Sequence, residues 1–250
     1  MRAAALAREA AALADRAAAM PAGPSLEAAL RGGGVAVLAE VKRRSPSKGA
    51  IAEALDAVAQ GRAYQRGGAV AVSILTEPAH FGGSTDDLRA VREQLAVPTL
   101  KKDFHVAPVQ LVEARALGAS AALLIARALD PDALAAMLET GRALGLELVV
   151  EVRDELELAR AIDGGATMIG VNNRDLETLV IDPRTCDRLL PRIPAGRVAI
   201  AESGVTGRAD VEHYAACGAD AVLVGSSLSS AADPEGATRA IVGVPRRTRG

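Results

Sequence analysis

Cysteine and histidine are scarce in this sequence of 250 residues, which has two of the former and three of the latter. Cys186 and Cys217 do not stand at a spacing typical of metal ligands, and the histidines are scattered along the chain. A disulfide scaffold or a zinc site is therefore not expected, and we predict that no metal is bound. A reducing compartment is the default for such a chain, so we expect a cytoplasmic protein.

Neither sign of charge dominates, and a long uninterrupted apolar run is missing. Lysine plus arginine numbers 29 and aspartate plus glutamate 31, so nothing indicates a surface for a polyanion, and we expect no nucleic-acid partner. The alanine-rich start of the chain is interrupted by Arg8, Glu9, Asp15 and Arg16, which neither a signal peptide nor a membrane span would tolerate. We predict a helix there and no membrane partner.

The sequence also lacks a proline-rich or serine-rich linker, while 50% of its residues are hydrophobic. Its length fits either one large α/β barrel or two ordinary domains, and the missing linker favours one domain over residues 1–250. Short aliphatic runs recur along the whole chain and are candidate strands. They lie at 35–42, 70–75, 99–104, 121–126, 147–152, 168–173, 198–203 and 221–226.

Amphipathic segments such as "PDALAAMLETGRALG" separate these runs, so that strand and helix alternate. Such a repeat in a chain of about 250 residues predicts an α/β protein with the (β/α)8 TIM barrel fold, preceded by a short helical extension over residues 1–34. A doubly wound open sheet shows the same alternation. It is disfavoured because no run is followed by GxGxxG and because polar residues stand at the end of nearly every run.

Charged and polar residues gather where the predicted strands end, which is where a barrel of this kind builds its active site. The positions are Glu40, Lys42, Lys102, Glu151, Asn172, Glu202, Ser203, Gly225 and Ser226. Any single charged strand end is more often solvated or paired in a salt bridge than catalytic. Charged residues at corresponding positions of successive units nevertheless predict a site, because buried charges without partners are costly.

The stretch "PTLKKDF" at 98–104 places Leu100, Lys102 and Phe104 on one face of a strand and Lys101 on the other. If the first face is the barrel interior, Lys102 points into the site between two apolar side chains. Burial there lowers the pKa of the ammonium toward the range of a working acid, and a nearby glutamate opposes that change. His105 lies on the face opposite Lys102, where we expect packing or loop contacts rather than chemistry.

Glycine and serine follow the last two predicted strands, in "AESGV" at 201–205 and "VGSSL" at 224–228. Small residues let backbone N–H groups approach an anion, and the loops after strands seven and eight are the usual phosphate site of this fold. A tight turn would explain the same residues. Their position in the barrel favours phosphate binding at Ser203, Gly204, Gly225 and Ser226.

Two further loops carry candidate ligand contacts. "KRRSPSKG" at 42–49 is basic and broken by proline, and with Ser45 it suits a mobile cover over an anionic ligand. "HFGGS" at 80–84 offers Phe81 beside two glycines as an apolar flap. A solvated loop and a surface turn are the respective alternatives.

Taken together, these stretches resemble the indole-3-glycerol phosphate synthase family. The matching segments are "AEVKRRSPSKG", "SILTEPAHFGGS", "LKKDF", "LLIA", "VEVRDELE", "IGVNNRDLETL", "AESGV" and "VGSSL", from the first predicted strand to the last. The resemblance implies a carbon–carbon lyase of tryptophan biosynthesis without cofactor or metal. It would convert 1-(2-carboxyphenylamino)-1-deoxyribulose 5-phosphate into indole-3-glycerol phosphate, with loss of carbon dioxide and water.

The resemblance also implies roles for the strand-end residues. Lys102 would be the general acid that protonates the substrate ketone, and Glu151 the base or acid of the dehydration. Lys42 would be a second lysine that contacts the substrate carboxylate. Glu40 and Glu202 would hold these ammonium groups.

The remaining positions implied by the resemblance bind the substrate. Asn172 would hydrogen-bond to it and Arg174 would help to hold its carboxylate. Phosphate contacts would come from Ser45, Ser203, Gly204, Gly225 and Ser226. The pocket for the aromatic ring would be formed by Phe81, Phe104, Leu123 and Ile125.

Other functions stay open from the sequence. A different phosphosugar barrel is one, either a sugar isomerase or an aldolase that forms a Schiff base on Lys102. The isomerase is disfavoured because it needs a pair such as cysteine with aspartate, and neither Cys186 nor Cys217 ends a predicted strand. An inactive scaffolding barrel would be expected to have lost the charged strand ends. We expect a monomer, with a homodimer as the alternative, that binds a small phosphorylated substrate.

Overall fold

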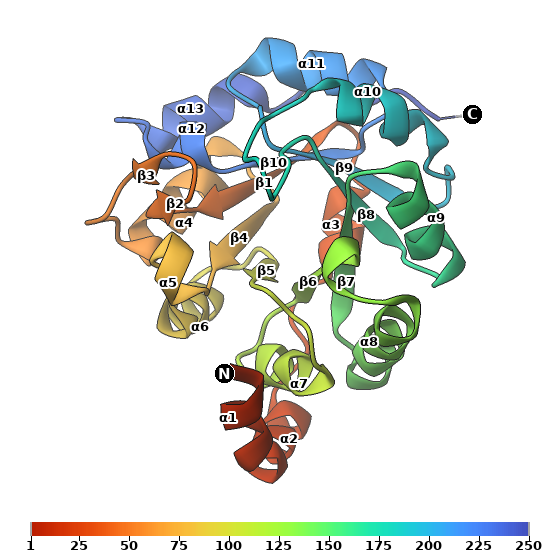
Figure 1. Cartoon of the computed structure of the whole chain (residues 1–250). Helices are drawn as coiled ribbons and strands as arrows, with labels where there is room; N and C mark the ends of the chain where they lie inside the picture. Colours follow the sequence, from red (N-terminus) through yellow and green to blue (C-terminus); the bar gives the residue numbers. More distant parts are fainter. Residues whose placement is uncertain (1, 250) are drawn as a thin grey trace.

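The computed structural model describes residues 2–249 and contains a closed barrel of parallel strands (Figure 1). Around the barrel the strands follow in the order β1-β10-β9-β8-β7-β6-β5-β4. They are β1 (Ala36–Val41), β4 (Ala71–Leu75), β5 (Thr99–Lys102), β6 (Ala121–Ile125), β7 (Glu147–Val152), β8 (Met168–Asn172), β9 (Val198–Glu202) and β10 (Ala221–Val224). Each predicted run contains one of these strands, so the predicted (β/α)8 fold is confirmed.

Helices cover the outside of the barrel (Figure 1). The longer ones are α4 (Ala57–Gly67), α6 (Thr85–Gln94), α7 (Pro108–Ala116), α8 (Pro131–Leu144), α9 (Glu155–Asp163), α10 (Arg184–Leu189), α11 (Arg208–Ala216) and α13 (Pro234–Ile241). Aspartates fix where several begin, because the side chains of Asp56, Asp130 and Asp154 each accept a backbone N–H of the first turn.

Short elements fill the loops at the mouth of the barrel. A two-stranded hairpin, β2 (Arg44–Ser45) with β3 (Gly49–Ala50), follows β1. Short helices lie in the same set of loops: α5 (Pro78–Phe81), α12 (Ser226–Ser229) and the 3-10 helix η1 (Ala126–Ala128). A second 3-10 helix, η2 (Leu190–Arg192), lies instead between α10 and the start of β9. The two predicted loop candidates, at 42–49 and 80–84, therefore contain a hairpin and a helical turn.

The two faces of the strands form two separate apolar cores, one against the helices and one inside the barrel. Side chains alternate along a strand, so a residue two positions beyond an inner-core residue faces the same interior. Toward the carboxyl ends of four strands this interior changes from apolar to charged. The pairs are Leu38 and Glu40, Leu100 and Lys102, Val149 and Glu151, and Ile200 and Glu202.

The first strand is preceded by α1 (Arg2–Arg8), α2 (Ala10–Ala19) and α3 (Leu26–Leu30). Leu13 and Ala17 of α2 pack on Ala116 of α7, outside the barrel. Leu26 and Leu30 of α3 are fully buried in the inner core, so α3 closes the end of the barrel opposite the charged strand ends. None of the helices over residues 2–249 has both the length and the apolar character needed to cross a membrane.

Truncation of the α3 contact is expected to weaken the whole barrel. Leu26→Ala removes a side chain that is 0% exposed and should lower the free energy of unfolding by about 2–5 kcal/mol, measured by urea denaturation. Leu156→Ala on α9, where the side chain is 70% exposed, serves as the control and should change it by less than about 0.5 kcal/mol. Equal losses in the two variants would contradict the role of α3.

Candidate active site

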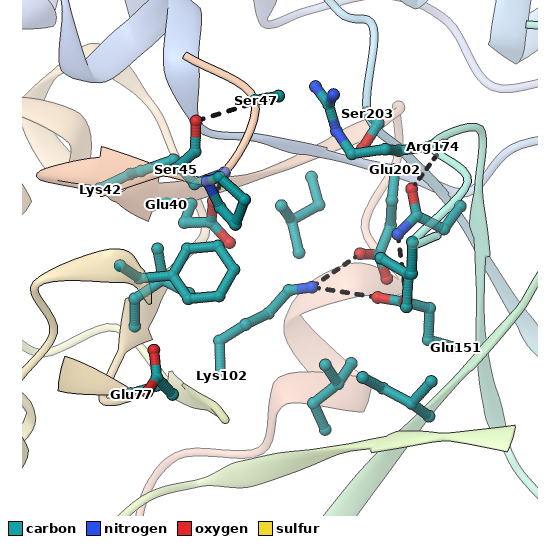
Figure 2. Close-up of a pocket in the computed structure, with 18 of the residues that line it drawn as sticks. Glu40, Lys42, Ser45, Ser47, Glu77, Lys102, Glu151, Arg174, Glu202 and Ser203 are labelled. Atoms are coloured by element: carbon teal, nitrogen blue, oxygen red, sulfur yellow. Dashed lines mark hydrogen bonds and ion pairs between the residues drawn. The ribbon is translucent and has the colours of Figure 1, made fainter. Parts of the chain in front are cut away.

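A cavity of about 210 Å³ lies at the end of the barrel where the strands terminate (Figure 2). The predicted catalytic candidates all line it, and they come from five different strands or from the residue just after a strand. They are Glu40, Lys42, Lys102, Glu151, Asn172 and Glu202. The convergence predicted from the strand ends is therefore present in the structure.

The centre of the cavity is an ammonium held between two carboxylates (Figure 2). Lys102 Nζ lies 3.1 Å from Glu151 Oε2 and 3.1 Å from Glu202 Oε2. On its other side, Glu151 Oε1 accepts a hydrogen bond of 3.0 Å from Asn172 Nδ2. Asn172 Oδ1 in turn accepts the backbone N–H of Arg174 at 2.9 Å. Strands β5, β7, β8 and β9 thus each supply one member of a connected polar group.

A second ion pair stands across the cavity. The ammonium of Lys42 pairs with Glu40 Oε1, and the Glu40 side chain is buried. The backbone between them is fixed from behind: Tyr64 Oη and Ser229 Oγ donate to the Glu40 carbonyl at 3.2 and 2.9 Å. Ser229 Oγ also accepts the Lys42 N–H at 3.1 Å. These contacts hold the end of β1 in place as it enters the loop.

Two glycines make room for the buried glutamates. A methyl group at Gly170 on β8 would overlap Glu202 Oε1, and one at Gly225 after β10 would overlap Glu40 Oε1 and lie 3.0 Å from Lys42 Nζ. Glycine is therefore required for the inward rotamers of both carboxylates. Gly225, which the sequence suggested as a phosphate ligand, has this steric role in the structure.

The charge on Lys102 is held more firmly than the sequence predicted. Burial opposes the charge, but attraction to the carboxylates of Glu202, Glu151 and Glu40 outweighs it, and the pKa of the Lys102 ammonium lies above its usual value. Both effects were expected from the sequence, and the attraction is the larger of the two because the fold brings three carboxylates near one ammonium. Lys102 is consequently protonated throughout the neutral range.

The two glutamates beside Lys102 differ in their affinity for protons. Burial raises the pKa of Glu202 to about 7, with repulsion from Glu151 adding to the rise and Lys102 opposing it. Burial also acts on Glu151, but Lys102 and the hydrogen bond from Asn172 outweigh it and hold the pKa of that carboxyl below its usual value. The pair therefore carries a proton that can leave near neutral pH.

Behind the cavity, the opposite face of β5 carries a second buried charge cluster. Lys101 is 0% exposed, and its Nζ lies 2.9 Å from Asp103 Oδ2, 3.3 Å from Glu113 Oε2 and 3.2 Å from His105 Nε2. His105 Nδ1 lies 2.7 Å from the Leu123 carbonyl, so this nitrogen carries a proton and Nε2 accepts from the ammonium. The cluster ties the loop after β5 to β6 and α7.

The same cluster fixes the backbone on which Lys102 and Phe104 stand. Asp103 Oδ2 accepts from Thr76 Oγ1 at 2.6 Å, and Asp103 Oδ1 accepts the Phe104 N–H at 2.9 Å. Gln110 Nε2 donates to the Phe104 carbonyl at 2.8 Å. His105 therefore belongs to the loop contacts beside the site, on the face away from the cavity.

An apolar wall faces the ammonium. The rings of Phe81 and Phe104 lie with their centroids 6.2 Å apart at an interplanar angle of 46°, and Leu123 and Ile125 of β6 complete the wall. Strand β5 ends at Lys102, so Phe104 lies in the following loop and not on the strand as the alternation predicted. Phe104 nevertheless lines the cavity from this loop.

The predicted phosphate residues fall into two groups. Ser45, Ser203 and Ser226 line the cavity, whereas Gly204 and Gly225 are not among its lining residues. Ser203 and Gly204 both have positive φ angles, of 64° and 94°. Two consecutive left-handed residues form a sharp turn at the end of β9, and a non-glycine residue is strained in this conformation.

The cavity also contains residues that the sequence reasoning missed. Glu77 lines it while its side chain accepts two backbone N–H groups at the start of α5. Leu176 and Leu179 reach it from the loop after β8, where Arg174 Nη1 donates to the Leu179 carbonyl at 2.7 Å. Burial lowers the pKa of Arg174. The apolar letters within "RDLETLV" were the only signal for this part of the wall.

A cluster of acids and bases at the mouth of a (β/α)8 barrel defines a barrel enzyme. The fold is similar to 3-hexulose-6-phosphate synthase from Salmonella typhimurium, with a TM-score of 0.64 and 18% identity over 83% of this chain and 96% of that chain. Thiamine phosphate pyrophosphorylase from Pyrococcus furiosus gives a TM-score of 0.61 and 17% identity over 83% and 93%. At these identities the likeness shows the fold alone.

The family model for indole-3-glycerol phosphate synthase matches residues 2–241. The indole-3-glycerol phosphate synthase of Mycobacteroides abscessus is 51% identical over 86% of this chain and 79% of its own length. That of Streptomyces griseus is 50% identical over 92% and 86%. The chain belongs to the indole-3-glycerol phosphate synthase family, and its activity is that of a carboxy-lyase of tryptophan biosynthesis.

A methyl group on β8 is expected to disable the site without unfolding the barrel. Gly170→Ala displaces the Glu202 carboxylate from Lys102 and should lower kcat/KM by on the order of 10²-fold, because a shift of about 1 Å in a catalytic group costs that much. Steady-state kinetics with circular dichroism would measure it. Gly196→Ala, where a methyl group meets no atom within 4 Å, is the control. Full activity in Gly170→Ala would contradict the prediction, because it would show that activity does not depend on the position of the Glu202 carboxylate beside Lys102.

The raised pKa of Glu202 makes the stability of the barrel depend on pH. The folded state holds a proton that the unfolded chain releases above about pH 4.5, so the carboxyl favours folding less as pH rises from about 4.5 to 7. Glu202→Gln removes this titration. The free energy of unfolding of the variant relative to wild type should rise between pH 5 and pH 8, by at most on the order of 3 kcal/mol, in paired urea denaturations. A difference that is flat with pH would contradict the assignment.

Proposed function

We propose that this chain converts 1-(2-carboxyphenylamino)-1-deoxyribulose 5-phosphate into indole-3-glycerol phosphate and that Lys102 is the acid of the ring closure. The observation that carries the proposal is the Lys102 ammonium, held by two buried carboxylates and facing an aromatic and aliphatic wall. Closing the indole ring requires a proton donor for the ketone oxygen. It also requires an apolar surface beside that donor, against which the aromatic ring can lie.

The two anionic ends of the substrate have separate partners in the proposal. Ser45, Ser203 and Ser226 line the cavity and would donate to the phosphate from the hairpin after β1, the turn after β9 and the start of α12. Lys42 and Arg174 are the cationic side chains left for the ring carboxylate among the described residues that line the cavity. The ring itself would lie against Phe81, Phe104, Leu123 and Ile125.

In the first half of the reaction, the ring carbon that bears the carboxylate attacks the ketone carbon, and Lys102 donates its proton to the ketone oxygen. The new carbon–carbon bond interrupts the aromaticity of the ring. Loss of carbon dioxide returns the bonding electrons to the ring and restores it. Lys102, left neutral, regains a proton from the Glu151–Glu202 pair, whose proton is mobile near neutral pH.

In the second half, the hydroxyl group formed from the ketone leaves as water with a proton from the protonated lysine. Glu151, which is ionised, takes the proton that must leave carbon to form the double bond of the indole. Asn172 donates to Glu151 and fixes its orientation for this step. Glu40 holds Lys42 in the same way that Glu202 holds Lys102.

The aldolase alternative fits the site poorly. A lysine that forms a Schiff base must be a neutral amine, which requires a lowered pKa. Here burial is outweighed by carboxylates, and the pKa of Lys102 is raised. The proposal also includes a monomer, or a homodimer with two complete sites, that acts in the cytoplasm. Its partner would be a small phosphorylated molecule, with no nucleic acid and no membrane.

Purified protein and the carboxyphenylamino substrate should yield the fluorescence of an indole. Lys102→Met should lower kcat/KM by about 10²–10⁴-fold, the range for loss of a general acid, while Arg239→Ala on the exposed face of α13 should not. Borohydride added during turnover should leave the wild-type mass unchanged. Undiminished turnover by Lys102→Met, or a reduced adduct on Lys102, would overturn the proposal.

A further inference from the structure

Three side chains of types that can bind a metal ion meet on the outer helices, and none of them lines the cavity. Asp187 lies on α10, His213 on α11, and Cys217 is the residue that caps α11. His213 Nε2 lies 2.6 Å from Asp187 Oδ1, and Cys217 Sγ lies 3.5 Å from the same oxygen. The three donor atoms are all within 4.8 Å of one another.

The spacing of the helix residues explains this meeting. His213 and Cys217 are four residues apart, one turn of helix, so both side chains project from the same side of α11. The turn is closed by the hydrogen bond of 3.1 Å from the Cys217 N–H to the His213 carbonyl. Asp187 approaches from the neighbouring helix, and its contribution could not be read from the spacing of cysteines and histidines alone.

We infer that Asp187, His213 and Cys217 form a binding site for a transition-metal ion of the zinc class, with water in the fourth position. A thiolate, an imidazole and a carboxylate are the ligands that zinc takes, whereas magnesium and calcium prefer all-oxygen sites. Metal–ligand bonds of about 2.0–2.3 Å at tetrahedral angles place donor atoms about 3.3–3.6 Å apart. The sulfur–oxygen separation of 3.5 Å already meets this.

Binding of the metal ion requires a small movement of the His213 and Asp187 side chains, and their exposure permits it. The imidazole and carboxylate must part from 2.6 Å to about 3.3 Å to admit the ion. The side chains of His213 and Asp187 are 52% and 40% exposed, so both can rotate and the ion can reach them from solvent. The bound ion would replace the hydrogen bond between His213 and Asp187 by three coordinate bonds across α10 and α11.

A metal ion bound here would connect α10 and α11, and both helices also hold the residue that follows β8. Cys186, beside Asp187, donates its N–H to Asn173 Oδ1 at 3.0 Å, and Tyr214, beside His213, accepts from Asn173 Nδ2 at 2.9 Å. Both helices that carry the ligands therefore also hold Asn173, which follows the last residue of β8. Metal binding would stabilise the joint between the end of β8 and the outer ring, independently of the reaction proposed above.

Cobalt(II) tests the site directly, because a cobalt thiolate absorbs in the near ultraviolet and a tetrahedral cobalt ion in the visible. Protein stripped with a chelator and titrated with cobalt should show both bands, saturating at one equivalent, and zinc should abolish them. Cys217→Ser should remove the near-ultraviolet band, and His213→Gln should weaken binding at least tenfold. Cys186→Ser, which removes the other thiol and keeps the cluster, should bind as wild type does.

Thermal denaturation supplies an independent measurement. Zinc should raise the Tm of the wild-type protein and of Cys186→Ser, because an ion that binds only the folded state stabilises it, and it should leave Cys217→Ser unchanged. The inference is overturned if wild-type protein shows no thiolate band at millimolar cobalt, or if Cys217→Ser and His213→Gln bind cobalt as tightly as wild type.

Discussion

The mouth of this barrel depends on one ammonium shared by two buried carboxylates. Neither Glu151 nor Glu202 could remain inside the barrel without Lys102, and Lys102 could not remain there without them, because a buried charge that loses its partner is strongly destabilising. When all three are ionised the group carries a net negative charge. One carboxyl therefore retains its proton to a higher pH while the other stays ionised. The arrangement places an exchangeable proton beside the Lys102 ammonium.

The fold and most of the site could be predicted because they follow from local rules. Strand parity places Lys102 two residues after Leu100 and Glu202 two residues after Ile200, so their direction is set as soon as the apolar residues face inward. The barrel then brings the ends of separate strands to one mouth without any further information. The length of each strand was less certain from the sequence, and Phe104 was placed on β5 although that strand ends before it.

The properties that could not be predicted depend on distances between remote parts of the chain. The sign of the pKa shift of Lys102 is decided in part by Glu40, which comes from another strand. The need for glycine at position 225 depends on the Glu40 carboxylate, which occupies the space that a side chain at this position would fill. In the same way, the strand pattern gives no partner for Lys101, whose ammonium pairs with Asp103 in the loop after β5 and with Glu113 on α7.

The two adjacent lysines at the end of β5 affect how the alignment of this strand with its neighbours is specified. A slip by one residue would turn Lys101 into the barrel and Lys102 toward the helices. The two side chains are identical, so electrostatic attraction to the interior glutamates cannot tell the correct alignment from the shifted one. The choice is left to uncharged packing, above all to Leu100, which is fully buried in the inner core. An uncharged leucine thus decides which of the two lysines reaches the interior carboxylates.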